Sequence, residues 1–237
     1  MKNSFIGIDG CKYGWIAIEI INETQFSFEL LKNISAIHKY KKSQILIDMP
    51  IGLSDESINR NIDIKAKKLL STSKKSSIFI PPCREAVYAN SYEDAKKINQ
   101  KTLGKSLSIQ AWNICPKIKE LDIFLIEKST HIPFLREAHP EICFTLLNNG
   151  SSFSSKKSTP EGQNDRLNLL QSHFKNAKYI FESVLSSTKR KDVKKDDILD
   201  ALVLAVCGFL HHNKSTKKII NTPLKDKKGL EISLWYF

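Results

Sequence analysis

The sequence predicts an α/β fold in which a sheet of mixed antiparallel and parallel strands is flanked by helices. Three observations predict it. Three short apolar segments near the N-terminus are joined by tight turns, a continuous apolar run follows them, and a long apolar segment lies near the C-terminus. The first pattern is typical of an antiparallel meander, the second of a strand buried on both faces, and the third of a buried helix.

The first elements follow one another closely. Gly14 marks the turn after the first strand, and Pro50 ends the fourth strand because proline has no amide hydrogen for the ladder. A short amphipathic segment separates the third strand from the fourth. The predicted elements up to residue 50 are three strands, the amphipathic segment and the fourth strand, at 4–10, 15–20, 26–31, 34–40 and 45–50.

Residues 54–129 are predicted to form a mostly helical insertion after the fourth strand. Apolar residues recur with helical spacing at 58–70, 92–103 and 107–125, and the Ser/Lys-rich stretch 71–77 separates the first two. An insertion at this point begins and ends on the edge of the sheet where ligands bind in open α/β folds. We therefore expect it to cover that edge.

The rest of the chain has weaker patterns. Residues 134–141 are predicted to form a fifth strand beside the fourth, and 165–175 a helix. Residues 150–162 are rich in Ser, Lys, Gly and Pro, which is typical of a mobile loop. The apolar, alternating segment 230–237 predicts a late strand at the edge of the sheet.

The late apolar segment contains an acidic residue that packing alone does not explain. From Ile198 to Leu210 every residue is apolar or Gly except Asp200, and burying an ionised carboxylate is costly without a compensating cation or donor. Asp197 lies three residues earlier, on the same helical face. Capping of the helix N-terminus is the alternative explanation for Asp196 or Asp197, but it does not explain Asp200, which lies a full turn inside the helix.

Two more acidic residues follow strands of the predicted core. Asp9 comes at the end of the first strand and Asp48 at the end of the fourth. An Asp after a strand can simply start a turn. Together with Asp197 and Asp200, however, these residues predict one shared carboxylate site. Carboxylate oxygens are the ligands that hard divalent cations such as Mg²⁺ or Mn²⁺ prefer.

Further residues are predicted to serve this site. Glu137 and His139 alternate on one face of the fifth strand and offer a metal ligand and a proton-handling imidazole; alternatively, Glu137 and Arg136 tie the insertion to the sheet. From the insertion we expect a phosphate-binding arginine, an amide and an aromatic ring to face the carboxylates. The substrate-binding candidates are Lys12, Arg84, Gln110, Trp112 and His139. Core packing is the alternative for Trp112, and an Arg–Glu pair the alternative for Arg84.

Composition sets wider limits. The chain has 237 residues, which suits a single domain carrying the insertion. Its formal net charge of +12 favours phosphate-bearing partners, although Lys far outnumbers Arg and many Lys side chains can simply be solvated. Five cysteines without a Cys-x-x-Cys pair indicate a reducing cytoplasm. No apolar segment is long enough for a membrane span, and none resembles a signal peptide.

The motifs resemble those of a family of uncharacterised proteins, domain-of-unknown-function family 429, which is expected to have an RNase H-like fold. The resemblance is nearly end to end. Its segments are Gly7–Lys12, Ile47–Leu53, Pro81–Tyr88, Ser108–Asn113, Glu137–Glu141, Pro160–Gly162 and the Asp197–Leu202 helix start. The last is also similar to the final helix of RuvC-type Holliday-junction resolvases, although Asp48 stands where those enzymes carry Glu.

The resemblance implies a metal-dependent nuclease. Asp9, Asp48, Asp197 and Asp200 would hold two Mg²⁺ or Mn²⁺ ions, with Glu137 as a further catalytic carboxylate, and the partner would be DNA or RNA. A catalytically inactive nucleic-acid or protein-binding module is the alternative. An actin-like or sugar-kinase-like ATPase fits less well, because the chain is too short for a duplicated domain. The type of nucleic acid and the oligomeric state, a homodimer included, stay open.

Overall fold

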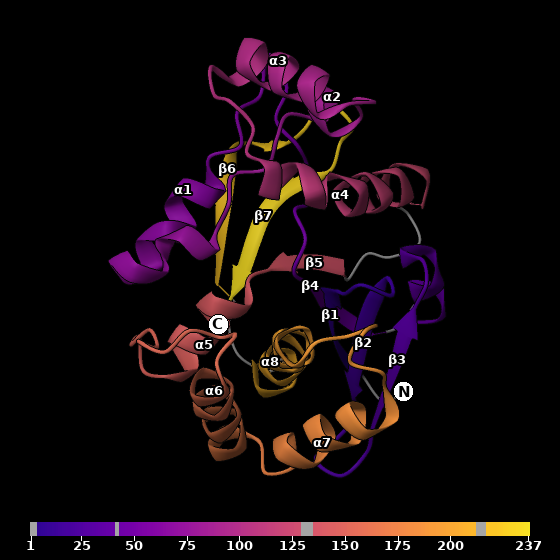
Figure 1. Ribbon diagram of the computed structural model, residues 1–237, viewed down its shortest axis with the longest axis vertical. Helices are drawn as coiled ribbons and strands as arrows, with labels where there is room; N and C mark the ends of the chain where they lie inside the picture. The colour runs from indigo at the N-terminus through magenta and orange to yellow at the C-terminus, as the bar shows by residue number, and fades with distance from the viewer. Residues whose placement is uncertain (1–3, 41–42, 129–134, 212–216) are drawn as a thin grey trace.

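The computed structural model describes residues 4–40, 43–128, 135–211 and 217–237. Within these ranges the chain forms a seven-stranded mixed sheet with strand order β3-β2-β1-β4-β5-β7-β6. Helices cover both faces of this sheet (Figure 1). The α/β fold class predicted above, with an antiparallel meander joined to parallel strands, is therefore confirmed.

The meander and the fourth strand lie where the sequence places them. β1 pairs antiparallel with β2, β2 pairs antiparallel with β3, and β4 joins β1 in parallel. The amphipathic segment before β4 is a 3₁₀ helix, η1. The bounds are Phe5–Gly10 for β1, Trp15–Ile20 for β2, Phe26–Leu31 for β3, Ile34–Tyr40 for η1 and Gln44–Ile47 for β4. All of β1 except Gly10 is buried.

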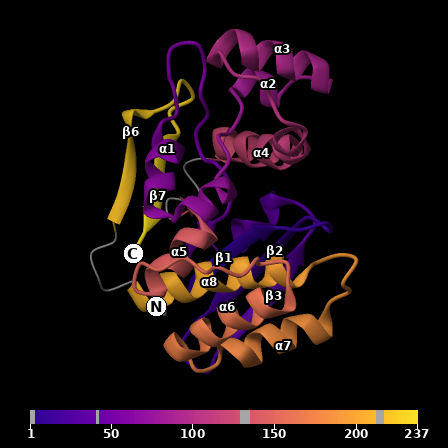
Figure 2. The same cartoon turned by 60° about the vertical axis from the view of Figure 1, so that its left-hand side comes forward.

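The apolar segment near the C-terminus is the buried helix α8, Lys195–His211. It lies directly across β1, and Gly7 makes the close approach possible: a Cβ atom at this position would come within 1.9 Å of the carbonyl oxygen of Ala201. Helices α5 (Pro140–Leu147), α6 (Pro160–His173) and α7 (Ala177–Ser187) surround α8 on the same side of the sheet (Figures 1 and 2). Their apolar side chains and those of the sheet form one continuous core.

The insertion after β4 is helical, as predicted. Its longest helix, α4, shares a second core with η1 and the opposite face of the sheet. The shorter helices α2 and α3 lie beyond α4, at the end of the molecule farthest from α6 and α7 (Figures 1 and 2). The elements are α1 Ile62–Ala66, the 3₁₀ helices Lys67–Leu69 and Thr72–Ser77, α2 Arg84–Val87, α3 Tyr92–Leu103 and α4 Ile109–Lys128.

The fifth strand and the helices after it differ in part from the prediction. β5, Leu135–Ala138, pairs with β4, but it does not continue to residue 141, because Pro140 begins helix α5, Pro140–Leu147. The helix predicted from residue 165 is α6, Pro160–His173, and it starts earlier because the Thr159 hydroxyl caps the amide of Gly162. A further helix, α7, Ala177–Ser187, was not predicted.

The C-terminal strand is not an edge strand, so this prediction is wrong. β7, Glu231–Tyr236, lies between β5, with which it is parallel, and β6, Lys217–Lys225, with which it is antiparallel. β6 forms the edge. Its side chains are mostly exposed and lack the period-two apolar pattern that would reveal a strand.

None of the helices in the described ranges combines the length and the apolar character that crossing a bilayer requires. All five cysteines are buried and have free thiols.

Candidate carboxylate site at the ends of the central strands

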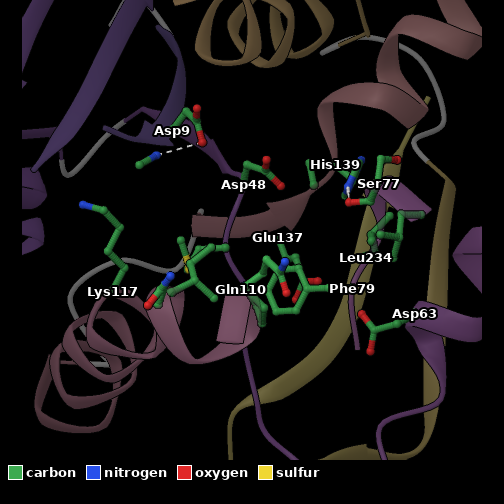
Figure 3. Close-up of a pocket in the computed structure, with 17 residues that line it drawn as sticks. Asp9, Asp48, Asp63, Ser77, Phe79, Gln110, Lys117, Glu137, His139 and Leu234 are labelled. Carbon is green, nitrogen blue, oxygen red and sulfur yellow. Dashed lines mark hydrogen bonds between the residues drawn. The ribbon is translucent and has the colours of Figure 1, made fainter. Parts of the chain in front are cut away.

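Three elements bring Asp9, Asp48 and Asp200 to one edge of the sheet. Asp9 is the fifth residue of β1, and Asp48 directly follows β4. Because the two strands are parallel neighbours, their carboxyl ends coincide, and the Asp48 amide donates to the Ile8 carbonyl at 3.0 Å. Figure 3 shows Asp9 and Asp48 side by side above a pocket. Asp200 approaches from α8, which crosses β1.

Asp9 and Asp200 are buried, Asp48 is half-buried, and their charges repel one another. Asp9 is 9% exposed and Asp200 is 3% exposed. Burial, together with the charges of Asp200 and Asp48, holds the pKa of Asp9 well above its ordinary value. Burial also raises the pKa of Asp48, and it raises the pKa of Asp200 to about 7. Such a cluster favours a proton or a cation in its midst.

Lys157 supplies a positive charge to the cluster. Its ammonium group donates to Asp200 Oδ2 at 2.6 Å, and its charge lowers the pKa values of Asp9 and Asp48 against the effect of burial. Burial opposes the charged ammonium, but the charge of Asp200 outweighs it, so the pKa of Lys157 is raised. The residue comes from the segment before α6, where we expected only a mobile loop.

The other carboxylate oxygen of Asp200, Oδ1, is buried and accepts no hydrogen bond from the described residues. An orphaned carboxylate oxygen in a cluster of hard oxygen donors suits a divalent cation such as Mg²⁺. Across the described part of the chain, no three His, Cys, Asp or Glu side chains are grouped closely enough, as they stand, to enclose a metal ion.

The Asp197 side chain caps the N-terminus of α8. Its Oδ2 accepts a hydrogen bond from the Lys194 amide at 2.8 Å, so the capping alternative describes its geometry. Its charge nevertheless contributes to the raised pKa of Asp9. Asp197 therefore lies at the margin of the cluster formed by Asp9, Asp48 and Asp200.

Glu137 ties the insertion to the sheet. Its Oε2 accepts from the Ile51 amide at 2.7 Å, and its Oε1 accepts from the guanidinium of Arg60. Arg60 is 1% exposed and also forms two hydrogen bonds with Asp63. The alternative given for Glu137 and Arg136 describes the contacts of Glu137 but not those of Arg136, whose guanidinium lies 3.7 Å from the ring centroid of Trp235.

The prediction that Glu137 and His139 alternate on one face of the fifth strand is wrong. β5 ends at Ala138, and His139 is the N-cap residue of α5. Glu137 and His139 still line the pocket. His139 Nε2 lies 3.3 Å from the Ser77 carbonyl oxygen, while Nδ1 is buried and unbonded among the described residues.

The pocket has a volume of about 410 Å³ and lies between the strand ends and the insertion. Gln110 lines it, as predicted, together with Lys117 from the same helix (Figure 3). Asn113, also from α4, is part of the same lining. The Lys117 ammonium donates to the Gly14 carbonyl and lies 4.6 Å from the ring centroid of Trp15. Asp9 and Asp48 form the wall opposite the insertion.

Three substrate-binding candidates lie elsewhere. Arg84 forms two hydrogen bonds with Asp122 and one with Asp226, and it lines a different pocket, so the prediction that it faces the carboxylates is wrong. Trp112 packs against Tyr92 with ring centroids 6.3 Å apart and is not among the described residues that line the site pocket. Lys12 is exposed in the turn after β1.

Comparison with known proteins agrees with the motifs. A family model described as "Protein of unknown function (DUF429)" matches residues 7–223. No curated protein matches the chain. No solved structure matches it either.

Proposed function

The chain belongs to the DUF429 family, and we propose that it is a metal-dependent nuclease that hydrolyses phosphodiester bonds of DNA or RNA. One observation carries the proposal. Three carboxylates, from β1, the end of β4 and α8, gather at one edge of the sheet; Asp9 and Asp48 line the pocket there, and burial raises the pKa of all three, with mutual repulsion adding to it for Asp9 and Asp200. A protein tolerates this cost at a functional site more readily than in a structural core.

The carboxylates are the groups that would hold metal. Asp9, Asp48 and Asp200, with Asp197 at the margin, would bind two Mg²⁺ or Mn²⁺ ions, and the unbonded Oδ1 of Asp200 fits this role. Bound metal would activate water and stabilise the leaving oxygen of the phosphodiester. The chain itself supplies Lys157, whose ammonium group is close enough to the cluster to neutralise a phosphate oxygen.

The charge of the whole protein supports a nucleic-acid substrate. A formal net charge of +12 raises the local concentration of polyanions and speeds their encounter with the protein. Lys117 lines the pocket from α4, whereas Lys12 is exposed in the turn that follows β1, outside the pocket. A phosphate chain bound at the strand ends would meet Lys117 first, and Lys12 would be available to a longer substrate.

The test is a cleavage screen with Mn²⁺ over single-stranded, branched and hybrid substrates, comparing wild type with Asp9→Asn and Asp200→Asn. We expect either variant to lose at least a hundredfold in rate, the size of effect that loss of a key electrostatic group produces. Asp196→Asn is the matched control, because Asp196 lies in the same helical turn as Asp197 outside the cluster, and it should cleave like wild type. Wild-type rates for Asp200→Asn would remove the proposal.

A catalytically inactive binding module is the second candidate, and one observation favours it. The Lys157 ammonium already compensates the carboxylates without any metal. A titration with Mn²⁺ followed by electron paramagnetic resonance distinguishes the two. A nuclease must bind Mn²⁺ through Asp9 and Asp200, whereas a module neutralised by Lys157 would bind none in the wild-type protein.

A further inference from the structure

The half of the pocket that lies away from Asp9 and Asp48 has the character of a binding site for a flat, polar-edged ring; the other two carboxylates that line the pocket, Glu137 and Asp63, are paired with Arg60. Its walls combine the apolar side chains of Phe79, Ile114 and Leu234 with the amides of Gln110 and Asn113. The volume of about 410 Å³ lies within the usual range for small-molecule sites. Figure 3 shows Phe79 and Gln110 within this region, with Asp9 and Asp48 above them.

The two amides are free to bind a ligand. Gln110 and Asn113 are three residues apart on α4 and so share one helical face, the face that lines the pocket. Within the described part of the chain, neither side-chain amide has a hydrogen-bond partner. Each amide offers donors and an acceptor. Together they can read a heterocycle edge that alternates donors and acceptors.

Two other groups fit the same ligand. The ring of Phe79 is half-buried between two apolar clusters and presents an aromatic surface to the pocket. Unpaired bases commonly stack on such rings. His139 also lines the pocket, and its buried Nδ1 has no partner among the described residues.

We infer that this half of the pocket binds an unpaired nucleobase of the substrate, so that cleavage is directed to single-stranded or terminal nucleotides. The inference rests on the proposed function, because Asp9 and Asp48 would then face the phosphate of the same nucleotide. A base inside a duplex has its edge paired and its faces stacked, and it must leave the helix before amides and an aromatic ring can reach it.

Binding of nucleoside 5′-monophosphates, measured by isothermal titration calorimetry with Mg²⁺ present, tests the inference without cleavage. Ribose 5-phosphate is the matched probe, because it keeps the sugar and phosphate and lacks the base. We expect at least one nucleotide to bind about tenfold more tightly than ribose 5-phosphate, since stacking of one base contributes about 1–3 kcal/mol. Equal affinity, or no nucleotide binding at millimolar concentration, would overturn the base pocket.

Variants of the amides localise the effect. Gln110→Leu and Asn113→Leu should each weaken nucleotide binding about threefold to tenfold, the size expected for one hydrogen bond, and leave ribose 5-phosphate unaffected. Gln100→Leu, at an exposed position of α3, is the matched control and should bind like wild type. Equal loss in the control, or no loss in the amide variants, would place the nucleotide elsewhere.

Cleavage assays distinguish a failure of the base pocket from a failure of the proposed nuclease function. If Asp9-dependent cleavage proceeds equally well inside a duplex and in a single strand, the base pocket is wrong while the nuclease stands. If the amide variants lose nucleotide affinity but no substrate is cleaved, the base pocket stands and the nuclease assignment fails.

Discussion

Asp200→Asn should stabilise the metal-free protein, and more so at high pH. Burial raises the pKa of Asp200 to about 7 from an ordinary value of 3.8. Between these values the folded protein holds its proton while the unfolded chain releases it. Since the folded state then binds more protons, its stability falls as the pH rises through this window. Asparagine carries no titrating proton and escapes this penalty.

The magnitude follows from the two pKa values. The raised pKa of Asp200 lowers the free energy of unfolding of the wild type by about 4 kcal/mol at pH 8 and by about 1 kcal/mol at pH 4.5. The value at pH 8 is an upper limit, because the neighbouring carboxylates titrate together. For a chain of this size each kcal/mol corresponds to about 2–4 °C in Tm. Loss of the Lys157 ion pair reduces the gain only slightly, since the Lys157 side chain is 44% exposed and can reach water.

The assay is thermal unfolding in EDTA at pH 4.5 and pH 8, with Asp196→Asn as the control. We expect Asp200→Asn to exceed wild type in Tm at pH 8 by several degrees and to approach it at pH 4.5, while Asp196→Asn shows no such pH dependence. A lower Tm than wild type at pH 8, or a difference that does not change with pH, would refute the reasoning.

Three further predictions concern the surroundings of the site. Arg60→Met should cost about 3–5 kcal/mol in urea unfolding, because it leaves Glu137 without its buried counter-charge; adding Glu137→Gln should recover part of the loss, and additive losses would contradict this. Lys157→Met should tighten Mn²⁺ binding about fivefold in a spin-resonance titration, since the metal then need not break the Lys157–Asp200 ion pair, which is worth about 1 kcal/mol. The control Lys156→Met should leave the affinity unchanged. Unchanged affinity in Lys157→Met would argue against competition between Lys157 and Mn²⁺ for Asp200. Gly7→Ala should lower Tm and weaken Mn²⁺ binding together, because its Cβ would meet the Ala201 carbonyl; a wild-type Tm would mean that the helix has room to move.

Much of the fold could be predicted because its strong patterns are local. The runs that end at Asp9 and Asp48 are continuous and apolar, and within α8 the segment 198–210 is apolar or Gly except at Asp200. Such segments fold in the same way in many contexts. The edge strand β6 was missed because its boundaries depend on which neighbours it meets and much less on its own periodicity. Helix α7 was missed although the sequence carries its signal, the helical spacing of its buried residues Ala177, Ile180, Phe181 and Val184.

The partners of charged side chains could not be predicted in the same way. Arg84 meets Asp122 and Asp226, which lie 38 and 142 residues further along the chain. No spacing rule connects residues so far apart. Lys157 could not be singled out, because a lysine in a Ser/Lys-rich segment resembles the many other lysines of the chain. Only the three-dimensional arrangement shows that its ammonium group reaches Asp200.

The contact between α8 and β1 at Gly7 also determines how the site can change over time. At Gly7 the backbone of β1 lies against the backbone of α8, with no β1 side chain between them whose size could vary, and Asp9 and Asp200 lie on these two elements. Substitutions elsewhere in the core can then swap one apolar side chain for another while the separation of the two carboxylates is preserved. Variation in what the protein recognises is accordingly expected in the insertion, where Phe79, Gln110 and Asn113 line the pocket and can be exchanged without moving the carboxylates.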